Sequence, residues 1–258
     1  MYKQEFEKLV AIMKQLRKEC PWDKAQSAES LRQYILEEAY ETIEAIDNRN
    51  WEELRKELGD LLLQIVFQAE IAEEMGRFTL LDVIENINKK LIERHPHVFG
   101  EVTVRNAEEV KENWEQIKVK KENRNSILEG LPRNMSALLL AQRIQDKASH
   151  VGFDWNEPGD VVQKIEEEIQ ELKQSMDSEN LAEIEYEIGD LFFSIVNLCR
   201  FYKINAEDSL RQASNKFVKR FKAMEQKLTK LKIPIRNASL EEMDKLWEEV
   251  KQESENKK

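Results

Sequence analysis

The sequence contains few of the residues that interrupt helices or cross-link small domains. Among 258 residues there are 7 glycines, 5 prolines and 2 cysteines. Cys20 and Cys199 cannot supply the disulfide framework of a small secreted domain, so we expect a reducing, cytoplasmic location. The shortage of glycine and proline leaves long uninterrupted segments, which argues against a β-rich fold with many tight turns.

The sequence also lacks long apolar runs and a surplus of basic residues. The longest apolar runs, such as residues 61–63, are far too short to span a membrane. The first residues do not contain the apolar stretch of a signal peptide. The formal net charge of −11 disfavours a surface that binds a nucleic-acid duplex. We therefore expect neither a membrane nor a nucleic acid as a partner.

Charged residues are abundant. They make up 35% of the chain beside 41% hydrophobic residues, a composition typical of long amphipathic helices that can still bury a core. Two apolar stripes at helical spacing are expected to face that core: Leu54, Leu58, Leu61, Leu62 and Ile65, and Ile184, Ile188, Leu191, Ile195 and Leu198. We predict an all-α fold with helices over residues 3–18, 28–48, 50–75, 79–95, 106–122, 134–149, 158–176, 179–202, 206–231 and 239–254.

A pattern of four carboxylates occurs twice, 130 residues apart. The first set is Glu38, Glu41, Glu57 and Asp60, and the second is Glu168, Glu171, Glu187 and Asp190. Each set consists of two pairs at i, i+3 spacing, which places each pair on one face of a helix. Carboxylates this close repel one another unless a cation lies between them, and hard oxygen ligands suit Mg²⁺ or Mn²⁺. The sequence therefore predicts two metal sites.

The repeat extends beyond the acids. Trp22-Asp23 matches Phe153-Asp154 at an offset of 131, and Trp114 matches Trp247 at an offset of 133. Landmarks that recur in the same order indicate tandem domains, which we expect over residues 1–120 and 135–258 with a polar linker over residues 121–134. A glycine inside the second acidic helix of each copy, Gly59 and Gly189, suggests the close approach of another backbone or a ligand.

These motifs resemble the MazG family of nucleoside triphosphate pyrophosphohydrolases in its tandem-domain form. The hallmark of the family is EExxE followed by ExxD. This chain has the hallmark over residues 37–41 with 57–60, and again over residues 167–171 with 187–190. The flanking segments CPWDKAQ, RHPHVFG and VGFDW match as well, so the resemblance covers nearly the whole chain.

The resemblance implies four-helix-bundle cores completed by dimerisation into a homodimer, and dependence on Mg²⁺. It implies cleavage of nucleoside triphosphates at the α–β bond to the monophosphate and pyrophosphate, with low base selectivity, in removing surplus or non-standard nucleotides. It implies that the catalytic metal ligands are Glu168, Glu171, Glu187 and Asp190, and that Lys164, Lys216, Arg220 and Trp247 contact nucleotide. Glu167, one residue before Glu168 and about 100° round the helix, is a further candidate that binds a second cation, orients a water or is a surface acid.

The two copies differ beside their carboxylates. Tyr34 occupies the position of Lys164, and Phe67 occupies that of Asn197, both at an offset of 130. Each change removes a cationic or polar group from the strip that faces the site, so Asn197 joins the predicted substrate-binding residues. We hypothesise that the C-terminal copy carries most of the activity. Two alternatives stay open: a narrower pyrophosphatase for dUTP or a modified dNTP, and a non-catalytic helical scaffold with structural metal sites.

Overall fold

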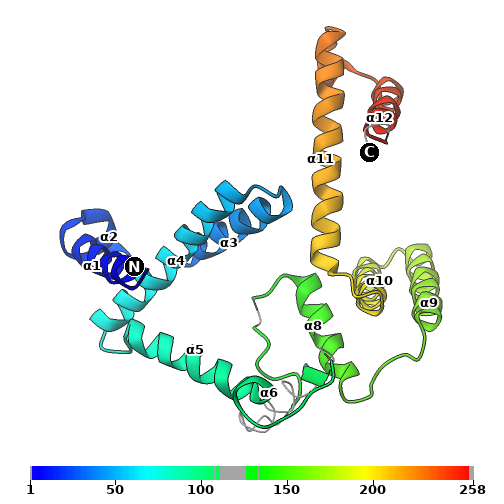
Figure 1. The fold of residues 1–258 in the computed structure, drawn as a ribbon. Helices are drawn as coiled ribbons and strands as arrows, with labels where there is room; N and C mark the ends of the chain where they lie inside the picture. Colours follow the sequence, from blue (N-terminus) through cyan, green and yellow to red (C-terminus); the bar gives the residue numbers. More distant parts are fainter. Residues whose placement is uncertain (1, 107–108, 111–125, 133, 256–258) are drawn as a thin grey trace. The chain divides into compact units, whose positions relative to one another are not determined.

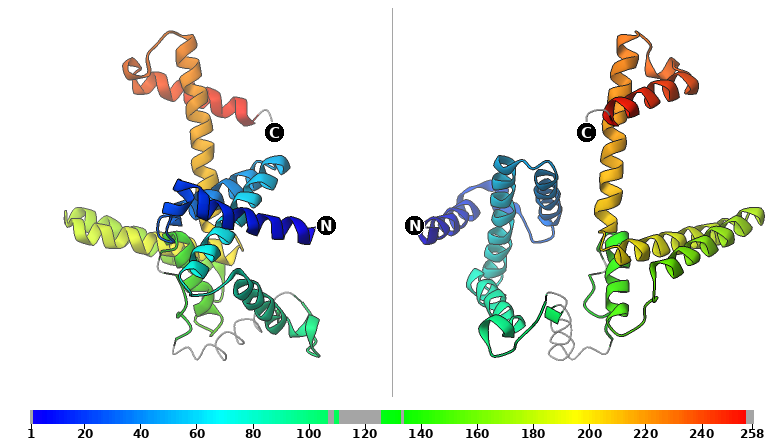
Figure 2. Two further views of the ribbon diagram at one scale, coloured as in Figure 1. Left: turned by 90° about the vertical axis from the view of Figure 1, so that its left-hand side faces the viewer. Right: turned by 45° about the vertical axis from the view of Figure 1, so that its right-hand side comes forward.

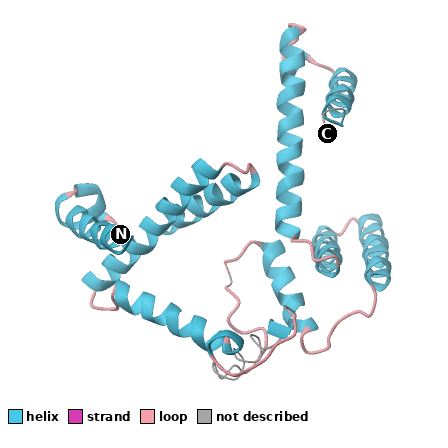
Figure 3. Ribbon diagram, in the orientation of Figure 1, coloured by secondary structure: helices cyan, strands magenta, loops and turns pink. Residues whose placement is uncertain are grey.

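The computed structural model describes residues 2–106, 109–110, 126–132 and 134–255, and these form helices, turns and loops without a strand (Figure 3). The predicted all-α fold is thereby confirmed. The chain divides into two compact units, Met1–Ile117 (unit 1) and Lys118–Lys258 (unit 2). Most of the predicted helix over residues 106–122, and residues 121–125 and 133 of the predicted linker, lie outside the described residues. The domain boundaries near residues 120 and 135 therefore stay a prediction.

Unit 1 is built around a pair of antiparallel helices. Its elements are α1 (Tyr2–Glu19), α2 (Pro21–Ala25), α3 (Arg32–Asp47), α4 (Trp51–Glu74), α5 (Leu80–Arg94) and α6 (Pro96–Phe99). Helices α3 and α4 lie side by side, and α1 and α5 each contact α4 (Figure 1). This arrangement places the two acidic segments of the first copy against each other.

Unit 2 repeats the antiparallel pair. Its elements are α8 (Ala137–Ser149), α9 (Pro158–Asp177), α10 (Leu181–Phe201), α11 (Ala206–Lys230), the short 3₁₀ helix η1 (Ile235–Asn237) and α12 (Leu240–Glu255). Helices α9 and α10 form the hairpin, α8 packs on α10, and α12 packs back against the far end of α11 (Figure 2). None of the helices in the described part of the chain combines the length and apolar character needed to cross a membrane.

The nine predicted helices that fall on described residues are all present. The largest difference is the start of α3, at Arg32 rather than residue 28. Residues 28–31 form a turn instead, because the hydroxyls of Ser27 and Ser30 accept hydrogen bonds from each other's backbone N–H groups at 3.2 and 3.0 Å. Such side-chain-to-backbone bonds compete with the helical ladder.

The hairpin turns of the two units are built alike. Arg49 and Glu179, which are 130 residues apart, end α3 and α9 in the left-handed conformation with φ of 52° and 55°. Asn50 and Asn180 follow as N-caps, and their side chains accept hydrogen bonds from the backbone N–H groups of Glu53 and Ala182. A left-handed residue followed by a cap ends one helix and begins the next within three residues.

The two apolar stripes are less buried than the sequence predicted. Leu58, Leu62 and Ile65 on α4 are 51%, 37% and 46% exposed, although Val66, Phe67, Ala69, Ile71 and Ala72 of the same helix are buried. At the matching positions on α10, Ile188, Phe192 and Ile195 are 39%, 55% and 41% exposed. The described part of one chain therefore does not bury these residues, and the predicted four-helix cores completed by dimerisation stay a prediction.

Candidate active site

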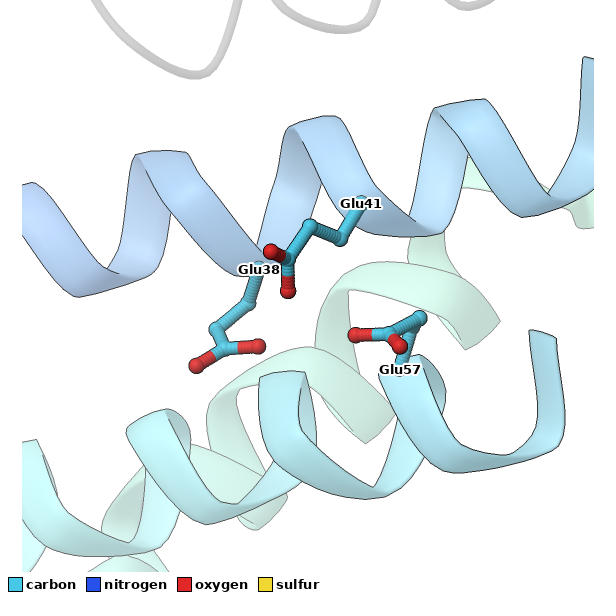
Figure 4. A group of neighbouring side chains, drawn as sticks. All are labelled: Glu38, Glu41 and Glu57. Atoms are coloured by element: carbon cyan, nitrogen blue, oxygen red, sulfur yellow. The ribbon is translucent and has the colours of Figure 1, made fainter. Parts of the chain in front are cut away.

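Three carboxylates of the first set converge between α3 and α4. Glu38, Glu41 and Glu57 bring carboxylate oxygens within 4.8 Å of one another (Figure 4). Burial raises the pKa of Glu57 to about 7, and its hydrogen bond with Glu53 and the charge of Glu41 add to the shift. Burial and the charge of Asp60 also raise the pKa of Glu38. The raised values reflect burial and the mutual repulsion of carboxylates packed together.

The second set forms the same group between α9 and α10, from Glu168, Glu171 and Glu187. Glu168 is only 4% exposed. Lys164 Nζ lies 2.8 Å from Glu167 Oε1 and 2.9 Å from Glu168 Oε1. Those two hydrogen bonds raise the pKa of Lys164, and burial together with the charge of Glu168 raises the pKa of Glu171. Lys164 is therefore a fixed positive charge beside the carboxylates.

The fourth member of each set does not join its group. Among the described residues, the convergent carboxylates are three in each unit and include neither Asp60 nor Asp190. Asp60 still lies near enough for its charge to raise the pKa of Glu38. Asp190 lines a cavity together with Glu168. In each unit three of the four predicted carboxylates converge and the aspartate lies beside them, so the four-ligand sets stay a prediction.

The trio in unit 2 fits a small divalent cation. Glu168 Oε2 is buried and has no hydrogen-bond partner, although an unsatisfied buried oxygen is costly. Two further carboxylates offer oxygens within 4.8 Å. An all-oxygen donor set of this charge suits Mg²⁺ or Mn²⁺, and it suits soft, thiolate-preferring metals poorly.

A cavity of about 710 Å³ lies beside Glu168 in unit 2. Helix α8 and the loop over residues 152–155 contribute to its lining, together with α9 and α10. Its lining is mixed: apolar and aromatic side chains come from Ile144, Phe153, Trp155, Val161 and Phe193, and polar ones from Gln145, Asp154, Lys164, Glu168, Asp190, Ser194, Asn197 and Arg200. A cavity of this size, apolar on part of its surface with a few placed polar groups, is typical of a small-molecule site.

Residues at the matching positions in unit 1 fill the space instead. Ile144, Val161, Lys164, Phe193 and Asn197 line the cavity in unit 2. Their counterparts, at offsets of 131 for the first and 130 for the others, are Met13, Leu31, Tyr34, Leu63 and Phe67. Met13, Leu31 and Phe67 are buried in the hydrophobic core of unit 1, and Tyr34 and Leu63 pack against it. Unit 1 therefore keeps the carboxylates and replaces the neighbouring cavity by packed side chains.

A smaller cavity of about 270 Å³ does occur in unit 1. It is lined by Ile35, Leu61, Gln64, Ile65, Gln68, Ala69, Phe78 and Val83, and none of the three carboxylates contributes to its surface. Its lining offers no charged group to a phosphate. It is therefore no counterpart of the cavity in unit 2.

The structure separates the predicted substrate-binding residues into two groups. Lys164 and Asn197 line the cavity. Lys216 and Arg220 lie on α11 and Trp247 lies on α12, and none of them contributes to that lining. Trp247 packs against the core between α11 and α12, with its ring 5.1 Å from that of Phe217.

Several lining residues were not among those predicted from the sequence, and two of them, Arg200 and Gln145, have side chains that bond to other lining residues. Arg200 gave no signal in the repeat, because its counterpart in the first copy is Glu70. Gln145 on α8 is buried and donates to the Phe193 carbonyl at 2.8 Å. A lone glutamine on an amphipathic helix has no sequence signature, so only packing reveals it.

Comparison with known proteins agrees with this architecture. The family model "MazG nucleotide pyrophosphohydrolase domain" matches the chain twice, over residues 26–99 and 157–224. The chain is 47% identical over 250 residues to the nucleoside triphosphate pyrophosphohydrolase/pyrophosphatase MazG of Thermotoga maritima, covering 95% of each protein. It is 40% identical over 259 residues to a nucleoside triphosphate pyrophosphohydrolase of Escherichia coli K12, covering 96% of this chain and 98% of that protein.

The described residues form two helical units, and each unit has a helical hairpin with three converging carboxylates. With two family matches and relatives similar along nearly their whole length, the chain belongs to the MazG family of nucleotide pyrophosphohydrolases. A similar segment also occurs inside a longer chain, the uncharacterized protein YabN of Bacillus subtilis. That protein is 41% identical over 254 residues, which are 96% of this chain and 52% of YabN.

Proposed function

We propose that unit 2 hydrolyses nucleoside triphosphates, ribose or deoxyribose, at the α–β bond, giving the nucleoside monophosphate and pyrophosphate with low base selectivity. The observation that carries the proposal is the cavity beside Glu168, where a carboxylate trio, a lysine and aromatic walls meet. The names of the relatives support the reaction class. A structural metal site would need neither Lys164 nor a cavity large enough for a nucleoside, which argues against the scaffold alternative.

The residues divide into those that meet the cation and those that meet the nucleotide. Glu168, Glu171 and Glu187, with Asp190 beside them, would hold Mg²⁺ or Mn²⁺. When bound, such a cation neutralises phosphate charge and lowers the pKa of water. Lys164 adds a positive charge next to Glu168. Glu167 pairs with Lys164 and is 57% exposed at its side chain, so we assign it to orienting Lys164 or a water.

The nucleotide would be held at both ends. The aromatic side chains of Phe153, Trp155 and Phe193 line the cavity and offer apolar surface to a base. Lys216 and Arg220, at i, i+4 on α11, and Trp247 on α12 remain proposed contacts to the triphosphate and the base. Because they do not line the cavity of a single chain, a second chain or a movement of α11 has to bring them to it.

We also propose that the chain forms a homodimer. The exposed stripes at Leu58, Leu62 and Ile65, and at Ile188, Phe192 and Ile195, support this. A Cβ atom added at Gly59 or Gly189 would meet no heavy atom within 4 Å, so the close approach expected at these glycines is not made within the described part of the chain. A second copy laid on each hairpin would complete a four-helix core. A cytoplasmic location, and domains over residues 1–120 and 135–258, complete the proposal.

The reaction is tested by pyrophosphate release from canonical and modified nucleoside triphosphates, with Mg²⁺, with Mn²⁺ or with EDTA. We expect release that needs the cation and differs little between bases. Release from dUTP or one modified dNTP alone would favour the narrower pyrophosphatase. No cation-dependent release from any triphosphate would overturn the proposal.

A matched pair of variants assigns the activity to one unit. Glu168→Gln removes a charge from the trio in unit 2, and we expect kcat to fall by roughly 100-fold or more, because metal ligation in the transition state is lost. Glu38→Gln makes the same change in unit 1 and should leave kcat within about two-fold of the wild-type value. The reverse result would place the active site in unit 1.

A further inference from the structure

Arg200 connects two walls of the cavity in unit 2. Its guanidinium makes a two-pronged ion pair with Asp154, in which Nη1 lies 2.9 Å from Oδ2 and Nη2 contacts Oδ1. Its Nε donates to Asn197 Oδ1 at 3.0 Å. The Arg200 side chain is 12% exposed, and that of Asp154 is 29% exposed. Charge-assisted, bidentate hydrogen bonds are the strong and geometrically specific ones.

The contact with Arg200 determines which end of the Asn197 amide faces the cavity. A guanidinium group has donors only, so the Asn197 atom that meets Arg200 must be its oxygen. The Nδ2 group, which can only donate, is then left for the cavity that Asn197 lines. An acceptor atom of a bound nucleotide is therefore the matching partner.

The contact with Asp154 links Arg200 to the loop that carries Phe153 and Trp155, the aromatic wall of the cavity. Asp154 Oδ1 accepts a hydrogen bond from the Trp155 backbone N–H at 2.9 Å, so the arginine, the aspartate and this loop form one network. Phe153 and Trp155 on either side are 82% and 45% exposed, and the backbone N–H of Phe153 also donates to the Ala148 carbonyl at 3.1 Å. The ion pair also neutralises an acid that would otherwise repel a polyanion.

The first copy shows that anchoring the loop does not require an arginine at this position. Position 70, the counterpart of position 200, is a glutamate there, and position 67, the counterpart of Asn197, is a buried phenylalanine. The loop of unit 1 is held from α1 instead, where Arg17 Nη1 donates to the carbonyl oxygens of Asp23 and Gln26. The arrangement of Arg200 with Asn197 occurs only in the unit that has the cavity. This favours a role in binding a ligand over a role in anchoring the loop alone.

We propose that Arg200 is a positioning residue of the active site. It orients the Asn197 amide so that Nδ2 donates to an acceptor of the bound nucleotide, and it holds the Phe153–Trp155 loop as the aromatic wall. The proposal rests on the proposed function, since it names how that same site holds its substrate. Asn197 follows Asp190 by seven residues, about 10 Å along the helix, which favours an acceptor on the nucleoside part over one beside the carboxylates.

The test measures kcat and KM for pyrophosphate release by the full chain and its variants. Arg200→Met keeps the length of the side chain and removes the donors, and we expect KM to rise roughly ten-fold with a smaller change in kcat. Arg200→Lys keeps the charge without the fork and should recover part of the loss. Arg143→Met is the matched control, because Arg143 pairs with Asp146 on α8 and does not line the cavity. It should leave both constants unchanged.

A double-mutant cycle separates positioning from simple support of the fold. If Arg200 acts through Asn197, Asn197→Ala should cost much less in the Arg200→Met background than in the wild type. If the changes in KM caused by Asn197→Ala and by Arg200→Met are independent, so that the double variant shows their product, the proposal is overturned. An unchanged KM in a folded Arg200→Met variant would also overturn it. If Arg200→Met does not fold, the same criterion applies to Arg200→Lys.

A second measurement locates the acceptor. Inorganic tripolyphosphate, tested as a competitive inhibitor, should be unaffected by Asn197→Ala if the acceptor lies on the nucleoside, and should inhibit more weakly if it lies on a phosphate. An Asn197→Ala variant with unchanged KM and unchanged inhibition contradicts the proposal. A wild-type chain that releases no pyrophosphate would instead overturn the proposed function, so the two failures are distinct.

Discussion

At the scale of single residues, substitutions at a few matched positions decide whether a hairpin carries a cavity or a core. Asn197 lines the cavity of unit 2, and Phe67 at the same position in unit 1 is 3% exposed within its core. Lys164 and Tyr34 make the same contrast, since the tyrosine packs on that core and meets Trp22 edge-on at 6.0 Å. The polar residues leave room for a ligand, and the aromatic ones occupy it.

This contrast predicts opposite consequences for matched truncations. Phe67→Ala should lower the free energy of unfolding of unit 1 by about 3–5 kcal/mol, because it removes a buried ring and leaves a void. The Arg17 guanidinium also loses the ring over which it lies at 5.6 Å. Calorimetric unfolding of the full chain measures the loss, and pyrophosphate release should be unchanged. Asn197→Ala should do the reverse, with a small effect on stability and a large one on KM.

At the scale of elements, an ion pair connects the first and fourth helices of unit 1. Arg17 on α1 makes a two-pronged contact with Glu74 on α4, with Nε 2.9 Å from Oε1 and Nη2 2.5 Å from Oε2. The hydrogen bond with Arg17 lowers the pKa of Glu74 below its ordinary value of 4.5. The Arg17 side chain is 8% exposed, so loss of its partner leaves a shielded charge.

The ion pair predicts a dependence of stability on pH. Because the folded-state pKa of Glu74 is depressed, its contribution is fully present above the unfolded value near 4.5 and is lost as pH falls through the lower folded value. Acidification from pH 6 to about pH 3 should therefore destabilise the wild type more than Glu74→Gln. Urea unfolding at several pH values measures the difference. Parallel curves for the two proteins would mean that the pair contributes nothing.

The sequence predicted the helices well where their positions depend on neighbouring residues in the chain, and less well where they depend on other contacts. The long helices followed from apolar spacing, and their ends were placed to within four residues because prolines, asparagine caps and polar turns are local signals. The late start of α3 was missed, since it depends on Ser27 and Ser30 bonding to each other's backbone. The stripes at Leu58 and Ile188 were placed on the correct helices, and their exposure in one chain was not predicted. Periodicity shows that a face is apolar, and it does not show what covers that face.

At the scale of the whole molecule, the uncovered stripes predict an association between chains. Phe192→Glu puts a charge in the middle of the α10 stripe, and we expect it to shift the protein from dimer to monomer because burying an unpaired carboxylate is costly. Sedimentation equilibrium of the wild type and the variant measures this. Leu240→Glu, at an exposed residue that begins α12, is the control and should leave the assembly unchanged.

The sedimentation results also show whether a second chain covers the apolar stripes. A wild type that sediments as a monomer would show that no second chain lies on the hairpins. A variant that stays dimeric would show that the α10 stripe lies outside the contact. Either result would remove the basis for a four-helix core shared between chains.

The sequence alone determined the helical fold, the tandem repeat, the carboxylates that converge and the family. Each of these follows from the spacing of residues along one helix or from segments that match one another. Only the tertiary structure showed that three carboxylates of each set converge, and that one unit has a cavity where the other has a core. It also revealed the Arg200 network, whose members lie 46 residues apart along the chain. The physical reason is that convergence and filled volume depend on how side chains from different helices pack.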